Sequence, residues 1–275
     1  MKNPLLVVCF SLFTSLLFAQ QKNRLIPIWV DEFEANGAPD STKWSYDLGD
    51  HGWGNNELQE YTRELKNARV ENGILIIEAQ SDPGKPKGYT SARLVTKGNA
   101  AWKYGYFEIK AKLPTGVGTW PAIWMLPEQN TYGGWPRSGE IDIMEHVGYD
   151  PGNVHGTVHT EAFNHSIGTQ VGKIKSVPDF NTEFHTYAID WTADKIDFYI
   201  DDEKYFTFTK SAGDYKQWPF DQPFHLILNI AVGGNWGGQK GVDPAIWPQL
   251  MQVDYVRIYE KKPSDFSLLF LDHNE

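Results

Sequence analysis

Cysteine is nearly absent from this chain of 275 residues. The one cysteine, Cys9, lies in the N-terminal stretch, so the chain can form no internal disulfide. This excludes the small exported domains whose folds depend on disulfides. Hydrophobic residues make up 41% of the chain, so we expect one large domain that is stabilised by its own core.

Long apolar runs are scarce, and the clearest one is N-terminal. Residues 1–19 begin with the positive charge of Lys2, continue through an apolar core at 5–18, and offer a cleavage site before Gln20. This pattern predicts a secretory signal peptide. The alternative is a membrane anchor, but the run is short for a span and contains hydroxyl residues. We therefore expect a secreted protein, extracellular or periplasmic, with residues 20–27 as a short polar lead.

Positive charge is also in deficit. The chain carries 25 Lys and Arg against 35 Asp and Glu, a net charge of -10, which argues against nucleic acids and anionic membranes as partners. Aromatic residues, by contrast, are abundant, with 11 Trp, 13 Tyr and 15 Phe. Together with many Gly and Pro, they suit a cleft that stacks sugar rings. We expect a monomer that has no membrane contact once the signal peptide is removed.

Helical periodicity is weak throughout, whereas strand patterns recur. The segments that alternate in polarity are 106–113, 187–191, 196–200, 226–230 and 253–259. Many short strands separated by Gly, Pro and Asn turns predict an all-β sandwich or barrel. No linker divides residues 28–262, which we expect to form one domain, and residues 263–275 are predicted to be a C-terminal tail.

Two of these segments allow faces to be assigned. In the first we expect a core face made of Phe107, Ile109, Ala111 and Leu113. In the last we expect Val256 and Ile258 on one face, and on the other Val253, Tyr255, Arg257 and Tyr259. The loops expected to form binding walls are 82–88, 127–138 and 233–249.

The stretch that carries chemistry is 139–146, Gly-Glu-Ile-Asp-Ile-Met-Glu-His. Its three carboxylates, Glu140, Asp142 and Glu145, are separated by apolar residues that suit a buried strand. Burying carboxylates is costly unless they are paired, hydrogen-bonded or partly neutralised. A strand that accepts this cost is a candidate functional site, whereas an exposed strand with scattered acids would have fewer apolar neighbours.

The spacing of the three acids is irregular for a strand. Because side chains alternate, Glu140 and Asp142 share a face, while Glu145 would point the other way. One extra residue, a β-bulge near Ile143 and Met144, would return Glu145 to the side of Glu140. The glutamates could then approach the separation of roughly 5–5.5 Å that a retaining glycosidase needs. Close carboxylates cannot all ionise easily, so one should hold a proton that it can donate.

The acid motif resembles that of glycoside hydrolase family 16, in its laminarinase branch of endo-β-1,3-glucanases. Further segments that match in the same order are 54–59 (Gly-Asn-Asn-Glu-Leu-Gln), 89–93 (Tyr-Thr-Ser-Ala-Arg), 118–126 (Gly-Thr-Trp-Pro-Ala-Ile-Trp-Met-Leu) and 233–238 (Gly-Gly-Asn-Trp-Gly-Gly). The resemblance covers about residues 28–260. It implies a β-jelly-roll sandwich of two curved antiparallel sheets, concanavalin A-like, whose concave sheet carries the cleft.

The resemblance also implies roles for the acids. Glu140 would be the nucleophile, Glu145 the acid/base, and Asp142 the residue that holds the nucleophile in place and tunes the charge of the cluster. The residues alone do not distinguish the roles of the two glutamates. No cofactor is expected for catalysis, and the expected partner is a β-glucan polysaccharide.

Several residues outside the motif are candidate substrate contacts. Trp120 and Trp124 lie four apart, on one face of an extended segment, and would stack on sugar rings; core packing is the alternative for Trp124. Trp236, in a Gly-rich loop, is expected in the cleft wall. Asn55 and Arg93 match family positions that hydrogen-bond sugar hydroxyls or the acid cluster, with turn capping and a surface ion pair as the alternatives.

Two histidines follow the acid motif. The spacing of His155 and His159 would suit zinc on a helix, but their neighbours favour a strand. We therefore expect His159 to face the cleft, where it would support an acid or contact substrate. Asn164 begins a glycosylation sequon, which matters only if the host glycosylates exported proteins.

A structural calcium ion is a further implication of the resemblance. Relatives often carry one on the convex face, far from the cleft, and the matching positions here are Glu32, Gly73 and Asp254. Calcium takes oxygen ligands that include backbone carbonyls, so a glycine can contribute. The alternative for Asp254 is a hydrogen-bonded acid at a strand edge.

Two other functions remain open at this stage. The same chemistry could act on another polysaccharide, such as agarose, carrageenan or porphyran, although sulfated galactans would favour a basic cleft. The chain could also be a non-catalytic carbohydrate-binding jelly roll, but the presence of all three acids disfavours this. The favoured function is secreted, retaining endo-hydrolysis of β-1,3 bonds in laminarin-type or mixed-linkage glucans.

Overall fold

Residues 26–263 are the part of the chain that this computed structural model describes, and their regular structure is almost entirely β-strand. The one helix within that part is a short 3-10 turn, η2 (His165–Ile167). No helix among these residues is both long and apolar enough to cross a membrane. The predicted signal peptide and all but the first residue of the predicted tail lie outside the described residues.

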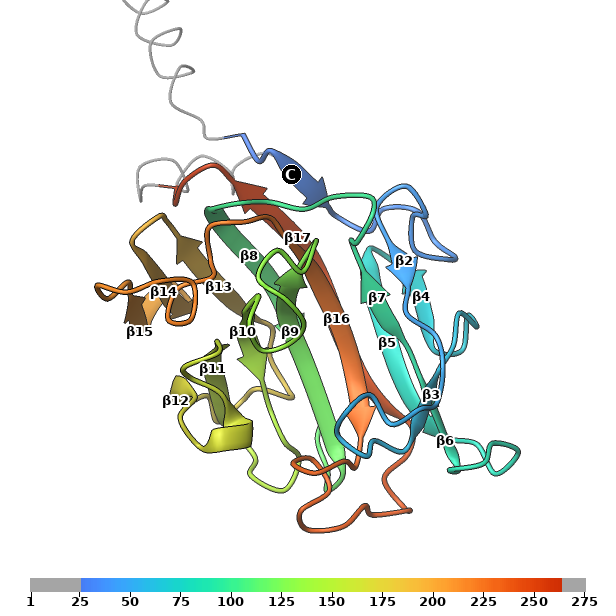
Figure 1. Cartoon of the computed structure of the whole chain (residues 1–275). Coiled ribbons are helices and arrows are strands. Elements are labelled where there is room, and N and C mark those ends of the chain that lie inside the picture. Colours follow the sequence, from blue (N-terminus) through green and yellow to red (C-terminus); the bar gives the residue numbers. More distant parts are fainter. Residues whose placement is uncertain (1–25, 264–275) are drawn as a thin grey trace, which may run out of the picture.

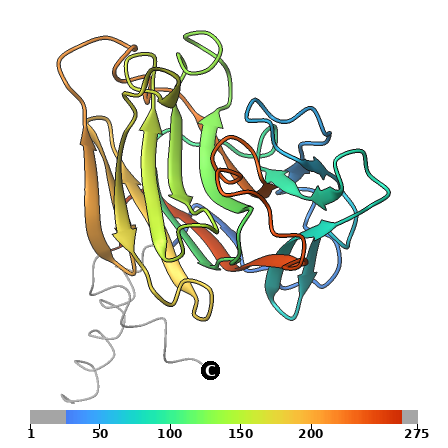
Figure 2. The same cartoon turned by 90° about the horizontal axis from the view of Figure 1, so that it is seen from below.

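Two sheets stack face to face, as Figures 1 and 2 show from two directions. The smaller sheet is antiparallel throughout. Its strands, in spatial order, are β12 (Val171–Ser176), β11 (Asn153–His159), β10 (Glu140–Glu145), β9 (Thr119–Pro127), β16 (Phe224–Val232), β7 (Arg93–Val95) and β2 (Ser45–Tyr46). The acid motif therefore lies on β10, an interior strand of this sheet.

The larger sheet has ten strands. Its main path is β15 (Glu203–Thr209), β14 (Lys195–Ile200), β13 (His185–Trp191), β8 (Gly105–Lys112), β17 (Gln249–Tyr259), β5 (Ile74–Ser81), β6 (Tyr89–Ser91) and β3 (Gln59–Tyr61). Off this path, β1 (Trp29–Asp31) pairs with β17, and β4 (Ala68–Glu71) pairs with β5. The predicted strands are all present, and they form a sandwich rather than a barrel.

The core lies between the two sheets. On β8 the predicted core face is confirmed, since Phe107, Ile109, Ala111 and Leu113 are each at most 2% exposed. Full burial of a large apolar side chain stabilises the fold by about 1.5–3 kcal/mol. The partners of these residues in the same cluster include Ile141 and Met144 of β10, so the core packs directly behind the acid motif.

The predicted faces of β17 are wrong at Val253. The pairing of β17 with β8 shifts register between Val253 and Tyr255, and a bulge of this kind reverses the alternation of side chains. Val253 is therefore buried in the core with Val256 and Ile258. Tyr255, like Arg257, lies on the opposite face, where it contacts Glu108.

Candidate active site

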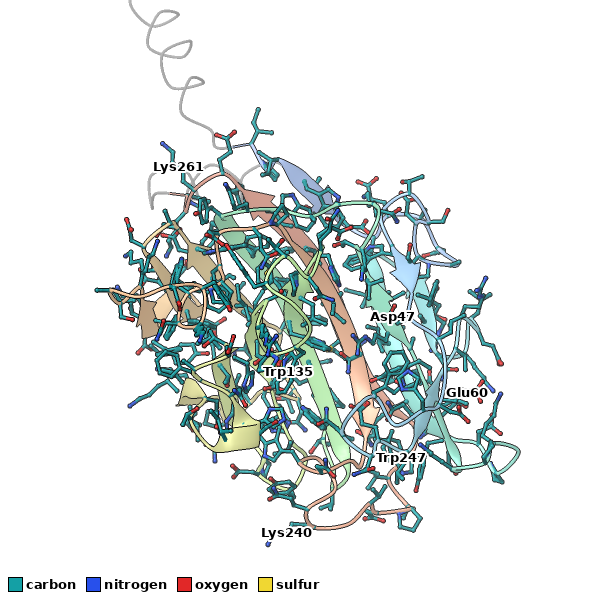
Figure 3. All side chains as sticks on the ribbon, in the orientation of Figure 1. Asp47, Glu60, Trp135, Lys240, Trp247 and Lys261 are labelled. Atoms are coloured by element: carbon teal, nitrogen blue, oxygen red, sulfur yellow. The ribbon has the colours of Figure 1, made fainter. Side chains whose placement is uncertain are left out.

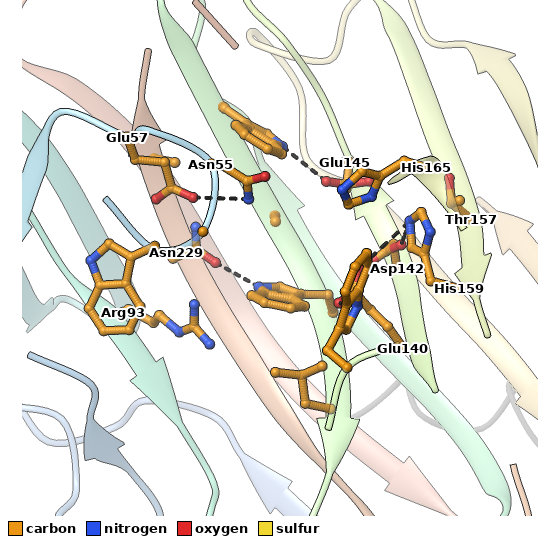
Figure 4. Close-up of a pocket in the computed structure, with 18 of the residues that line it drawn as sticks. Asn55, Glu57, Arg93, Glu140, Asp142, Glu145, Thr157, His159, His165 and Asn229 are labelled. Carbon is orange, nitrogen blue, oxygen red and sulfur yellow. Dashed lines mark hydrogen bonds and ion pairs between the residues drawn. The ribbon is translucent and has the colours of Figure 1, made fainter. Parts of the chain in front are cut away.

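The three motif acids lie in one cleft across the smaller sheet, with a volume of about 930 Å³ (Figure 4). In the pairing of β10 with β11, the register shifts between Asp142 and Glu145. In the pairing with β9, it shifts between Asp142 and Met144. The predicted bulge is thus confirmed, and it places Glu145 on the same side of the sheet as Glu140.

Local packing fixes the start of this strand. Gly139 has a φ of 87°, which disfavours any residue with a side chain. A Cβ there would also lie 2.8 Å from Pro219 and 3.0 Å from Phe220. Behind the acids, Ile141 and Ile143 are at most 1% exposed. The acids are therefore presented from a rigid, core-anchored strand.

A second row of polar side chains faces the acids from β11. Glu140 pairs with His159, Asp142 with Thr157, and Glu145 with His155. His159 Nε2 lies 3.7 Å from Glu140 Oε1 and 3.3 Å from Asp142 Oδ2. His159 therefore faces the cleft as predicted, next to both carboxylates.

The electrostatics of the cluster favour protonation. Burial, and then the charge of Asp142, raise the pKa of Glu140 well above its usual value. Since the pKa of Glu145 is raised as well, these shifts show that the cluster holds protons but do not assign the two glutamates different roles. Burial, and then Glu145, likewise raise the pKa of Asp142 well above its usual value. Burial also raises the pKa of Glu145. Asp142 Oδ2 is buried without a hydrogen-bond partner among the described residues, so the cluster does not fully compensate three negative charges.

Two indole N–H groups partly offset this cost. Trp135 Nε1 donates to Glu140 Oε2 at 2.9 Å, and Trp120 Nε1 donates to Glu145 Oε1 at 2.9 Å. Trp120 comes from β9 and Trp135 from the loop that precedes β10. Each glutamate thus accepts a hydrogen bond from a donor that cannot titrate in the working range.

The predicted tryptophans Trp120 and Trp124 both line the cleft from β9. Trp124 Nε1 donates to Asn229 Oδ1 at 2.7 Å. Its ring lies 4.7 Å from the guanidinium of Arg93, so Trp124 is not packed in the core. Trp236 also lines the cleft, with its ring edge-on to Trp120 at 5.4 Å.

In Figure 4, Arg93 lies apart from the acids across the cleft, whereas Asn55 lies between Glu57 and Glu145. Arg93 is sandwiched between the rings of Trp124 and Trp53, at 4.7 and 4.8 Å, and it pairs with Asp47 at 3.0 Å. The ion pair weighed from the sequence is therefore present, but within the cleft. Asn55 Nδ2 donates to Glu57 at 3.4 Å, so neither residue bonds the acid cluster directly.

Two of the three loops that were predicted to form binding walls line the cleft, and one does not. Loops 127–138 and 233–249 contribute side chains to the cleft, among them Trp135 and Trp236. Loop 82–88 contributes none. Instead Lys87 Nζ donates to the backbone carbonyls of Asp50 and Glu57. It thereby anchors the segment 50–57, several of whose residues line the cleft.

Comparison with known proteins identifies this cleft. Residues 55–257 match the family described as Glycosyl hydrolases family 16. The chain belongs to this family. It is 59% identical over 240 residues to a beta-glucanase of Rhodothermus marinus, covering 84% of each sequence. As a family 16 member the chain is a glycoside hydrolase.

Solved structures of family members share the fold. The laminarinase from Rhodothermus marinus aligns with a TM-score of 0.84 at 57% identity, covering 86% of this chain and 98% of that one. SCLam, a non-specific endo-beta-1,3(4)-glucanase, aligns with a TM-score of 0.81 at 47% identity, covering 87% and 92%. The expected jelly-roll sandwich is thereby confirmed.

Several cleft residues of this family member were not singled out from the sequence. They are Trp53, Glu57, Trp135, Thr157, His165 and Asn229. Glu57 lies inside a segment that matches the family, and Trp135 lies five residues before Glu140. Their closeness in sequence to matching motifs could have identified both as candidates. Asn229 gave no such signal, because its role depends on β16 lying beside β9.

Metal binding near the acids can be judged from distances. Ligand atoms of Glu140, Asp142 and His159 lie within 4.8 Å of one another, and this is the only such group within residues 26–263. His155 is not part of it, and both histidines lie on a strand. The arrangement disfavours the helical zinc site that was weighed from their spacing.

The predicted calcium residues converge through strand pairing. Asp31 pairs with Val256 and Val253 pairs with Leu75, which brings Glu32, Gly73 and Asp254 toward the same part of the larger sheet. The Glu32 carboxylate binds Arg257 at 2.7 and 3.1 Å, so Glu32 could offer calcium only its carbonyl. Asp254 pairs with Lys110 at 2.9 Å in a half-exposed and therefore weak ion pair. The residues fit a calcium site if Asp254 exchanges lysine for the ion, and the site stays a proposal.

The glycosylation sequon is not accessible in this fold. Asn164 is 4% exposed, and its amide donates to the carbonyls of Thr160 and Glu161. A glycan on Asn164 would break both hydrogen bonds. Asn164 therefore stabilises its own loop through these two hydrogen bonds.

Proposed function

We propose that this hydrolase cleaves β-1,3-glucosidic bonds within laminarin-type or mixed-linkage β-glucans, with retention of configuration. The laminarinase and the endo-beta-1,3(4)-glucanase that the chain resembles support this substrate class. The observation that carries the mechanism is the bulge in β10, which puts Glu140 and Glu145 on one side of one cleft. Retaining enzymes need this proximity, because one carboxyl attacks the carbon whose leaving group the other protonates.

In the first step Glu140 attacks the anomeric carbon while Glu145 protonates the departing glycosidic oxygen. Burial raises the pKa of Glu145, which favours the protonated form that this step requires. The pKa of Glu140 is raised too, so the assignment of the two roles rests on the order of the acids in the family motif. A covalent glycosyl-enzyme results, and the reducing-end fragment leaves. In the second step Glu145 takes a proton from water, and that water releases the sugar from Glu140 with β configuration.

Asp142 balances the charge of the cluster. Its pKa is raised well above the usual value by burial and by Glu145, so Asp142 shares a proton with its neighbours rather than adding a third full charge. That proton helps Glu140 to remain the ionised partner. His159, in contact with both carboxylates, limits how far either can move.

The charges around the cleft favour a neutral polymer. Five carboxylates line it, whereas the strong bases among its lining residues are Arg93 and Lys97. Arg93 is already neutralised by Asp47. A sulfated galactan would meet net repulsion there. We therefore place the sulfated polymers carrageenan and porphyran behind the glucans as substrates. Agarose is neutral, and we place it behind the glucans because of the likeness to a laminarinase.

Three measurements test this function. Reducing-sugar release from laminarin, lichenan, agarose and carrageenan should be greatest with laminarin, and laminarin viscosity should fall early, as internal cleavage requires. Proton NMR of the first products should show the β anomer before mutarotation. Preference for agarose or carrageenan would overturn the substrate assignment, and initial α product would overturn retention.

Export remains a separate proposal that rests on residues 1–19. N-terminal sequencing of protein collected outside the cytoplasm should begin near Gln20. A mature form that retains Met1 would refute it.

A further inference from the structure

Each of the two glutamates proposed to be catalytic accepts a hydrogen bond from an indole N–H, and the two indoles belong to different tryptophans. Trp135 Nε1 lies 2.9 Å from Glu140 Oε2, and Trp120 Nε1 lies 2.9 Å from Glu145 Oε1. One indole comes from a loop and the other from β9. Figure 3 labels Trp135 at the centre of the cleft-bearing side, and Figure 4 draws the bond that ends on Glu145.

We propose that Trp135 and Trp120 are positioning residues with separate targets, so that each indole controls one limb of the pH–activity profile. Trp135 would govern the acidic limb through Glu140, and Trp120 the basic limb through Glu145. The inference rests on the roles proposed above, in which Glu140 is ionised and Glu145 is protonated in the first step.

Ring packing and loop hydrogen bonds around Trp135 orient its N–H toward Glu140. One side of its ring system packs against His165, with ring centroids 4.9 Å apart at 35°. Its loop is closed by Ser138, whose hydroxyl accepts from the Tyr132 N–H and donates to the Gly133 carbonyl. Yet Trp135 is 42% exposed. An indole that is so exposed contributes little to the core, so its hydrogen bond to Glu140 needs a functional explanation.

Trp120 is held by a different set of residues. Its ring meets Trp236 edge-on at 5.4 Å, and Trp236 in turn meets His155 at 4.9 Å. A Cβ on Gly237 would lie 2.8 Å from Trp120 Cβ, so the Gly-rich loop packs tightly on this residue. The direction of the Trp120 N–H is therefore fixed by packing that does not involve Trp135.

An indole N–H only donates, so it stabilises a carboxylate more than the corresponding acid. Deleting the Trp135 N–H should raise the pKa of Glu140, leaving less of the attacking carboxylate at low pH. Deleting the Trp120 N–H should raise the pKa of Glu145, keeping the proton donor available to higher pH. The first change moves the acidic limb upward, and the second moves the basic limb upward.

Other titratable groups face the same carboxylates and also influence their pKa values. They are Asp142 on β10, His155 and His159 on β11, and His165 in the following loop. From β9 the neighbours are the uncharged Trp120 and Trp124. Interacting acids titrate as a group, so an apparent pKa does not belong to one residue. The test therefore asks which limb of the pH–activity profile each variant shifts.

The test compares Trp135→Phe and Trp120→Phe, which keep an aromatic ring but delete the N–H. For kcat/KM on laminarin, Trp135→Phe should move the acidic limb up by about one pH unit and leave the basic limb in place. Trp120→Phe should move the basic limb up by about one unit and leave the acidic limb in place. Trp124→Phe is the matched control, because it deletes an indole bond to Asn229 rather than to a glutamate, and it should move neither limb.

Folded variants whose limbs coincide with those of the unmodified enzyme would overturn the proposal, as would two variants that move the same limb. Product stereochemistry separates this failure from failure of the proposed function. Unmoved limbs with initial β product would refute only the indole assignment, whereas initial α product would refute retention itself. If Trp135→Phe does not fold, the Trp135 indole ¹⁵N–¹H resonance of the unmodified protein should titrate with the acidic limb, and a resonance that does not would also overturn the proposal.

Discussion

Buried carboxylates occur on both sheets of this enzyme, but they are compensated differently. In the cleft, Glu140, Asp142 and Glu145 face one another, and Asp142 Oδ2 has no hydrogen-bond partner among the described residues. On the outer face of the larger sheet, Glu108 is 8% exposed. Its two oxygens accept from the hydroxyls of Tyr255 at 2.9 Å and Tyr106 at 3.4 Å.

The difference separates the proposed catalytic acid cluster from an acid with a structural environment. Burial raises the pKa in both places, and a neighbouring acid raises it further in each: Asp142 at Glu140, Glu145 at Asp142, and Asp202 at Glu108. At Glu108 the leading opposing effect is the Tyr255 hydrogen bond, and Arg257 adds to it. Groups that must change protonation during a reaction gain from incomplete compensation, whereas a structural group gains from full hydrogen bonding.

The largest expected effect is on activity. Glu140→Ala or Glu145→Ala should each lower kcat on laminarin by about 10⁴-fold or more, by analogy with removal of catalytic groups in other hydrolases. Glu108→Ala provides the matched control, since it removes a buried glutamate from the other sheet and should leave kcat/KM unchanged. A large loss of activity in folded Glu108→Ala would break the comparison.

The tryptophans that we expect to stack on sugar rings should matter less than the acids. Trp124→Ala removes a ring from the cleft floor and also releases Arg93 from its stack. We expect about a tenfold loss of kcat/KM on laminarin, from lost stacking. Steady-state kinetics and a melting curve would test this, and unchanged kinetics in the folded variant would place the indole outside the substrate path.

Asp142→Asn should raise the free energy of unfolding, although it removes an acid of the proposed catalytic cluster. A carboxyl whose pKa is raised on folding binds more protons in the folded state than in the unfolded state. Its contribution is therefore lost as pH rises through the folded pKa. An asparagine in place of this acid would remove the penalty, so the variant should gain stability over the unmodified enzyme as pH rises above about 4. Denaturant unfolding at several pH values would show it, and a constant difference across pH would contradict the charge account.

For Glu108 the expected change is a loss of stability. Glu108→Ala leaves the hydroxyls of Tyr106 and Tyr255 without their acceptor, which should cost about 1–3 kcal/mol. Urea unfolding measures this directly. An unchanged free energy of unfolding would mean that Glu108 is no better compensated than the cleft acids.

The smallest expected effect concerns calcium. A ligand that binds only the folded state stabilises it by mass action, so chelation should lower the melting temperature by a few degrees and leave the chemistry nearly unchanged. Asp254→Ala should abolish this sensitivity. An identical melting curve for metal-stripped protein with and without added calcium would count against the site.

Much of this site was predictable because its signals are local. The interruption of alternation between Asp142 and Glu145 predicts the bulge, and the cluster of acids predicts raised pKa values. Side-chain alternation is also interrupted between Val253 and Val256. Both faces of β17 carry apolar residues, so the sequence pattern does not reveal this interruption, and the prediction for Val253 was wrong. Trp135 was missed for a different reason: the partner of an indole N–H depends on the path of a loop, which local pattern does not specify.

The central claim is that the bulge places two glutamates with distinct roles, Glu140 as nucleophile and Glu145 as acid/base, on one side of the cleft. The most direct test is azide rescue of the alanine variants with an activated β-glucoside. Glu140→Ala should give an α-glycosyl azide, because azide enters the face vacated by the nucleophile, while Glu145→Ala should give a β-glycosyl azide through the intact covalent intermediate. The reverse stereochemistry would exchange the two roles, and an absence of azide product from both folded variants would contradict the double-displacement account.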